Sequence, residues 1–63
     1  MEKPEPMIGQ TWTLDGAKDV FITDLVIEPD GRVIRQVEVG QREGAPESLA
    51  LQEFLSRAVY REG

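Results

Sequence analysis

Apolar and polar residues alternate along two stretches in the middle of the chain, residues 20–27 and 32–39. Both stretches are rich in β-branched side chains and lack helical spacing, so we predict two β-strands. The sequence between them contains Pro29-Asp30-Gly31, in which proline presets φ for a turn and glycine accepts a left-handed backbone. The pattern therefore predicts a β-hairpin with a three-residue turn.

Strict alternation in the first of these strands would bury the carboxylate of Asp24. An unpaired buried carboxylate is costly, so we predict a bulge near Thr23 and Asp24 that turns the acid to solvent. The apolar side chains that would then face inward are Val20, Ile22, Leu25 and Ile27.

Arg35 lies on an otherwise valine face of the second strand. The residues of that face are Val33, Arg35, Val37 and Val39, and the opposite face carries Ile34, Gln36 and Glu38. The arginine could reach water at the sheet edge, pair with Asp24 across the hairpin, or bind a phosphate or carboxylate of a partner. We expect the ion pair with Asp24.

The chain before the hairpin divides into an arm and a strand. Residues 1–7 contain two prolines, several charges and no apolar periodicity, and we expect an extended or disordered acidic arm. Order is expected to begin at Ile8. The inward residues of a strand over 8–14 would be Ile8, Gln10, Trp12 and Leu14, and Asp15-Gly16 would end it.

After the hairpin, residues 40–46 form a loop by composition, and residues 47–61 allow two interpretations. Helical spacing of apolar residues from Leu51 to Ala58 predicts a helix across the sheet. Alternatively, 48–52 is a short strand, 53–56 a tight turn and 58–61 a closing strand. We favour strand–turn–strand, because the open edges of so small a sheet need to be closed.

This element order is typical of a small SH3-like barrel. We therefore expect a mainly β fold with about five short strands and a single helical turn near the C-terminus, forming one domain over residues 8–63. The alternative is a three-stranded meander packed by a C-terminal helix.

A family resemblance supports the barrel. The residues that carry it are Gly9-x-x-Trp12, Val20-x-Ile22, Asp30-Gly31-x-Val33 and Leu49-x-Leu51-x-x-Phe54. At these positions, which extend across most of the chain, the sequence resembles short SH3-like proteins of bacterial and prophage genomes. That group has no established function. The resemblance implies the fold and a phage or prophage accessory protein. It implies no site, because the matching positions are core and turn residues.

The amino-acid composition lacks two of the residue types that enzymes commonly use for catalysis. The 63 residues include no cysteine and no histidine, so disulfides, thiolate metal sites and the usual general base are excluded. Ser48 and Ser56 lack a histidine partner, and no glycine-rich loop matches a phosphate-binding motif. We expect no catalysis and no cofactor. The acidic residues Asp15, Asp19 and Asp24 do not have the spacing of a calcium loop, so we expect no metal site either.

The net charge of −5 comes entirely from one half of the chain. Residues 1–31 hold seven acidic residues and two lysines, whereas residues 32–63 hold five of each sign. An acidic chain is repelled by phosphate, which disfavours nucleic acid and anionic membranes as partners. No apolar run approaches a membrane span and the first residues do not form a signal peptide, so we expect a cytoplasmic protein.

The favoured function is a small interaction module that binds another protein or itself, with no small-molecule substrate. Its expected contact residues are Phe21, Tyr60 and Arg35. Alternation turns Trp12 and Phe54 inward and Phe21 outward, while Tyr60 fits either a contact surface or the barrel end. A nucleic-acid-binding barrel is a second hypothesis, with phosphate contacts from Arg32, Arg35, Arg42, Arg57 and Arg61. A third is an acidic inhibitor that mimics phosphates with Asp15, Asp19, Asp24, Glu28 and Asp30.

Overall fold

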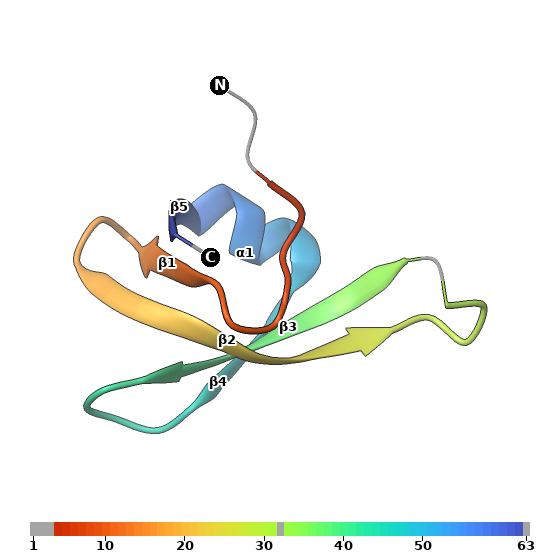
Figure 1. Cartoon of the computed structure of the whole chain (residues 1–63), viewed down its shortest axis with the longest axis horizontal. Coiled ribbons are helices and arrows are strands. Elements are labelled where there is room, and N and C mark those ends of the chain that lie inside the picture. The colour runs from red at the N-terminus through yellow and green to blue at the C-terminus, as the bar shows by residue number, and fades with distance from the viewer. Residues whose placement is uncertain (1–3, 32, 63) are drawn as a thin grey trace.

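The computed structural model describes residues 4–31 and 33–62, which form five antiparallel strands in one sheet and one short helix (Figure 1). The elements are β1 (Thr11–Leu14), β2 (Lys18–Ile27), β3 (Ile34–Gln41), β4 (Glu47–Ala50), α1 (Leu51–Arg57) and β5 (Ala58–Glu62). The strand order β4-β3-β2-β1-β5 brings the last strand back beside the first. This confirms the predicted mainly β small barrel. In the described part of the chain, α1 is too short to span a membrane.

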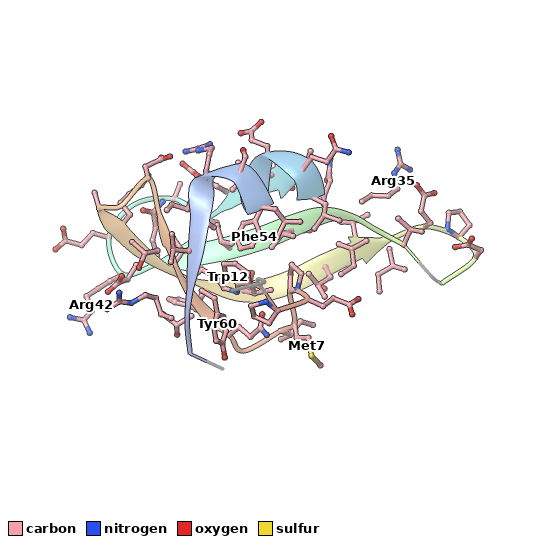
Figure 2. All side chains as sticks on the ribbon, turned by 90° about the horizontal axis from the view of Figure 1, so that it is seen from above. Met7, Trp12, Arg35, Arg42, Phe54 and Tyr60 are labelled. Carbon is pink, nitrogen blue, oxygen red and sulfur yellow. The ribbon has the colours of Figure 1, made fainter. Side chains whose placement is uncertain are left out.

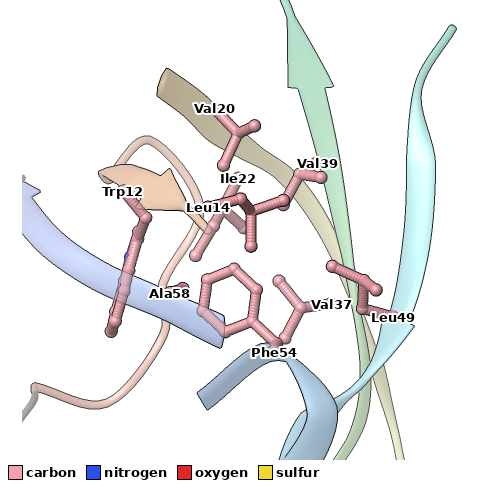
Figure 3. Close-up of a cluster of buried hydrophobic side chains, with 9 residues drawn as sticks. All are labelled: Trp12, Leu14, Val20, Ile22, Val37, Val39, Leu49, Phe54 and Ala58. Atoms are coloured by element: carbon pink, nitrogen blue, oxygen red, sulfur yellow. The ribbon is translucent and has the colours of Figure 1, made fainter. Parts of the chain in front are cut away.

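The hydrophobic core lies between the curved sheet and α1 (Figure 3). Its buried residues are Trp12, Leu14, Val20, Ile22, Val37, Val39, Leu49, Phe54 and Ala58. The Phe54 ring meets the Trp12 ring edge-on, with 4.8 Å between their centres. The predicted core positions of Trp12 and Phe54 are confirmed, and burial of these two rings accounts for much of the apolar area that stabilises so small a domain.

The predicted bulge in β2 is confirmed. The register against β3 shifts between Ile22 and Asp24, and the Asp24 side chain is exposed. Its Oδ1 accepts a hydrogen bond of 2.8 Å from the backbone N–H of Leu25. As expected, Val20 and Ile22 face the core, but Ile27 is 49% exposed rather than buried.

A second register shift, between Val26 and Ile27, overturns the prediction for Arg35. Val26 pairs with Gln36 and Ile27 with Ile34, so Arg35 is the extra residue. The shift turns Ile34 toward the core and leaves Val33 51% exposed, the reverse of the expected faces. Nε of Arg35 therefore lies 3.6 Å from Oε1 of Glu28, whereas Asp24 Oδ1 accepts a hydrogen bond from the Leu25 N–H.

The chain before β1 is anchored, and Ile8 does not belong to the strand. Gly9 has φ +97°, and the N–H of Gln10 bonds to the carbonyl of Met7, so a turn precedes Thr11 and leaves Ile8 63% exposed. Within the expected arm over 1–7, residues 4–7 form neither helix nor strand, and Pro6 is buried while Glu5 and Met7 are exposed. Residues 1–3 lie outside the described residues.

The loop after β3 and the hairpin turn between β2 and β3 both differ from the prediction. Gly40 belongs to β3, where it pairs with Phe21, so the predicted loop over 40–46 begins only after Gln41. The hairpin turn is one residue longer than expected: the N–H of Glu28 bonds to the carbonyl of Val33, with four residues between them.

The C-terminal region combines the two interpretations of residues 47–61. A strand precedes and follows as favoured, but the link is the seven-residue helix α1 and not a tight turn. Phe54 is fully buried on the inner side of this helix, and Arg57 Nη1 pairs with Glu53 Oε2 at 2.9 Å one turn back. The helix forms because it carries Phe54 to the centre of the core, which a single tight turn would not reach.

Candidate functional site

The half of the β2–β3 hairpin nearer its turn projects beyond the rest of the sheet (Figure 1). We call residues 23–36 the hairpin arm. β1 has four residues against ten in β2, and its pairing with β2 ends at Thr11 and Phe21. Beyond this point the segment before β1 lies beside β2 in place of β1, while β3 still pairs with β4 as far as Gln36 and Ala50.

A hollow of about 250 Å³ lies between the arm and that segment, and we call it the arm hollow. Its lining residues are Glu5, Pro6, Met7, Leu25, Ile27, Gly31 and Ile34. Met7 is 61% exposed and Ile27 is 49% exposed, while Leu25 and Ile34 are half-buried against the core. The walls are therefore mostly apolar and open to solvent.

Gln10 fixes the segment that forms one wall of the arm hollow. Its side chain is buried, and Oε1 accepts hydrogen bonds from the Met7 backbone N–H at 2.8 Å and from the Trp12 indole N–H at 3.0 Å. Its Nε2 donates to the Glu5 carbonyl at 3.2 Å. One amide thus satisfies the buried indole and holds Met7 against the arm.

Exposed apolar side chains concentrate at this end of the molecule. Of the seven large hydrophobic residues exposed in the described chain, five belong to the arm or to the segment before β1: Met7, Ile8, Val26, Ile27 and Val33. The other two, Phe21 and Val59, lie elsewhere on the outer surface. The concentration, rather than any single residue, distinguishes the arm from ordinary surface.

A second hollow, which we call the Phe21 groove, has a volume of about 650 Å³. It is lined by Thr11, Lys18, Asp19, Val20, Phe21, Gln41, Arg42 and Glu43. Two cations and two carboxylates balance within it, so the groove has no net charge for a polyanion. Nζ of Lys18 is 3.8 Å from Oε1 of Glu47, and Asp19 Oδ1 accepts the Thr13 hydroxyl at 2.9 Å.

Phe21 is 45% exposed, and its ring also lies across the backbone of Gly40. A Cβ at Gly40 would come within 2.8 Å of Cε2 of Phe21, so glycine is what allows the ring to lie flat on β3. One side of the Phe21 ring therefore packs on the neighbouring strand β3 and is not open to a partner.

The three predicted contact residues do not share a surface. Tyr60 is half-buried and packs edge-on against Trp12, with 5.4 Å between ring centres. Phe21 lines the Phe21 groove together with Arg42, and Arg42 and Arg35 lie at opposite ends of the molecule (Figure 2). Only Arg35 belongs to the arm, and there it is paired with Glu28.

The predicted phosphate-contact arginines are also dispersed. Arg35 and Arg42 lie at opposite ends of the molecule (Figure 2). Arg57 donates from Nε and Nη2 to the two carboxylate oxygens of Asp15, at 3.0 Å and 2.7 Å. Arg61 is exposed on β5, and Arg32 lies outside the described residues. A nucleic-acid surface would require these side chains on one face, and Arg35 and Arg42 do not meet that condition.

The acidic residues of the first half have separate structural partners. Hydrogen bonds from Arg57 lower the pKa of Asp15 below its usual 3.8, and the same contact raises the pKa of Arg57. Asp19 accepts from Thr13, and Asp24 accepts from Leu25. No group of three metal-ligating side chains occurs within residues 4–31 and 33–62.

Sequence reasoning missed the arm hollow because it placed Ile27 and Val33 inward and left Met7 in a free arm. One signal was available: Gly9, a residue that favours turns, interrupts the predicted strand over 8–14 near its start. A second signal was Gln10, a polar residue on the inward side two residues before a tryptophan whose N–H needs an acceptor.

No family model, curated protein or solved structure matches this chain. The proposal below therefore depends on the geometry and chemistry of the chain itself.

Proposed function

We propose that this chain is a non-enzymatic protein-binding module that contacts its partner through the arm hollow and the apolar side chains around it. The observation that carries the proposal is that five of the seven large hydrophobic residues exposed in the described chain belong to the arm or to the segment before β1, and that two of them, Met7 and Ile27, line the arm hollow. Apolar patches of this kind on a small domain are typical of interaction surfaces, because their exposure to water is unfavourable until a partner covers them.

The size of the hollow supports a side-chain anchor rather than a cofactor. Its volume of about 250 Å³ is below the range of about 300–1,000 Å³ common for small-molecule sites. A single large apolar side chain of a partner would contact Met7, Ile27 and Ile34 at once. Such a central anchor, surrounded by a polar rim, is typical of protein interfaces.

Binding through the arm is tested with the full chain immobilised as bait for a lysate of the source cells. Ile27→Ser removes an exposed apolar wall of the hollow, and Val59→Ser makes a comparable change on β5, where Val59 is 56% exposed. Captured protein should fall at least about tenfold with Ile27→Ser, as for a central interface residue, and stay unchanged with Val59→Ser.

Both variants should keep the circular dichroism spectrum and unfolding midpoint of the parent, since both side chains are exposed. Capture that is absent, or equal for the two variants, would contradict the proposal.

A further inference from the structure

We infer that the partner segment is basic and amphipathic: a large apolar side chain occupies the arm hollow, and flanking arginine or lysine residues face the acidic residues in and next to its lining. This inference deepens the proposed function and rests on it. The inference follows from the position of an apolar hollow in a region where acidic residues outnumber basic ones.

Acidic residues occur in and next to the lining of the arm hollow. Glu5 lines it, and Glu28 and Asp30 are the sequence neighbours of the lining residues Ile27 and Gly31. Arg35, the one basic residue in the described part of the arm, is 3.6 Å from Glu28. Counting Arg32 as well, residues 4–7 and 23–36 hold four acidic and two basic residues. The surplus of negative charge favours a cationic ligand.

The rest of the molecule strengthens this preference. All of the net charge of −5 arises from residues 1–31, which include Glu5 and one strand of the arm. The protein as a whole carries this net negative charge, which attracts a basic segment during diffusion and repels an acidic one. An arginine beside the apolar anchor would also form paired hydrogen bonds with Glu5 or Glu28.

A second copy of the chain fits the same surface less well. A two-fold contact would place Glu5 and Glu28 of both chains around one interface, where like charges repel. Strand pairing along the free edge of β2 is opposed as well, because the Leu25 N–H is already bonded to Asp24 Oδ1 at 2.8 Å. The apolar face of the arm, rather than its edge, is therefore the docking element.

The test selects short random displayed peptides against the full chain and measures the enriched peptides by fluorescence anisotropy. They should combine a net positive charge with at least one large apolar residue. Raising the ionic strength from about 0.01 M to about 0.15 M shortens the Debye length from about 30 Å to about 8 Å and should weaken binding about tenfold.

Three variants locate the contacts of these peptides. Ile27→Ser should weaken binding at least about tenfold through the lost apolar contact. Glu5→Gln should weaken it about threefold, as for a charge on an interface rim, whereas Glu43→Gln removes an equal charge from the Phe21 groove and should have no effect.

The remaining outcomes separate the two proposals. Peptides that depend on Ile27 but are neutral or acidic, or that ignore Glu5 and salt, would overturn the basic partner and leave the proposed function standing. A dimer in sedimentation that Ile27→Ser dissociates would also overturn it, since a second copy would then occupy the hollow. Peptides that bind independently of Ile27, or no enrichment at all, would overturn both.

Discussion

The two halves of the β2–β3 hairpin are made of the same kinds of residue, yet they differ in what covers them. We call the molecule outside the hairpin arm the barrel body. In the barrel body, Val20 and Ile22 are 1% and 2% exposed and belong to the same core cluster as Trp12 and Phe54. In the hairpin arm, Val26 and Ile27 of the same strand are 37% and 49% exposed. β-Branched residues thus specify the strand in both halves, and only a covering element turns a strand face into a core.

The largest expected contrast between body and arm is in stability. Phe54→Ala empties the centre of the core and should lower the free energy of unfolding by about 3–5 kcal/mol. Ile27→Ala, at a half-exposed site in the arm, should change it by less than about 1 kcal/mol. Urea titrations followed by Trp12 fluorescence measure both.

Because a domain of this size is stabilised by only about 3–5 kcal/mol, the Phe54 variant should be largely unfolded in water. Comparable losses from the two substitutions would show that the arm is part of the core.

Gln10 links the body to the arm, and its removal should have the next largest effect. Gln10→Leu leaves the buried Trp12 indole N–H without an acceptor, at a cost of about 1–3 kcal/mol. It also removes the bond that holds the Met7 N–H, so amide exchange at Met7 should accelerate. Unfolding titrations and hydrogen exchange by NMR give the two readouts.

Gln52→Leu, on the exposed side of α1, is the matched control. A stable Gln10 variant with unchanged exchange at Met7 would disprove this role of the amide.

A substitution at Gly40 tests whether the Phe21 ring packs on the barrel body or is free to contact a partner. Gly40→Ala places a Cβ within 2.8 Å of the Phe21 ring and should cost about 1 kcal/mol, at the low end for overpacking because the outer ring atoms can shift. In a Phe21→Ala background the same change should cost less, because the closest contact of the new Cβ is then Thr23 Cγ2 at 3.2 Å. A double-mutant cycle of unfolding free energies measures the coupling. Additive effects would mean that the ring does not rest on Gly40.

The Asp15–Arg57 pair joins the β1–β2 turn to the end of α1, entirely within the body, and we expect the smallest effect here. The folded pKa of Asp15 lies below its usual 3.8, so its contribution is present above that pH and is lost as the pH falls through the folded value. Unfolding midpoints measured from pH 6 down to pH 2 should therefore fall less steeply in Asp15→Asn.

Asparagine also tolerates the φ of +54° at this position, so backbone strain is not introduced. A slope in the Asp15 variant equal to that of the parent would rule out the pair as its source.

Several features of the fold followed from the sequence because their physical causes are local. Pro29 and Gly31 define the hairpin turn, and the cost of burying Asp24 predicts the β2 bulge. The alternation around Trp12 identified most of the inward face of β1. These features depend on backbone preferences and side-chain polarity within a few residues.

The candidate site depends on contacts between residues that are distant in the sequence, and the sequence alone did not reveal these contacts. Arg35 pairs with Glu28 because a second register shift moved it out of the ladder, which its own strand does not encode. Arg57 and Asp15 are separated by 42 positions. From the sequence, Arg57 was a candidate phosphate contact and Asp15 a candidate phosphate mimic, so their pairing was not predicted. Ile27 and Val33 have the residue type of core positions but have no helix above them.

The amino-acid pattern thus accounts for a small, mainly β fold with a hairpin and for the absence of histidine and cysteine chemistry. It does not show which apolar strand faces remain uncovered, that Gln10 binds the Met7 backbone, or which charges neutralise each other. The reason is that secondary structure responds to neighbours along the chain, whereas burial and charge pairing depend on strand lengths and registers that are fixed together when the sheet forms.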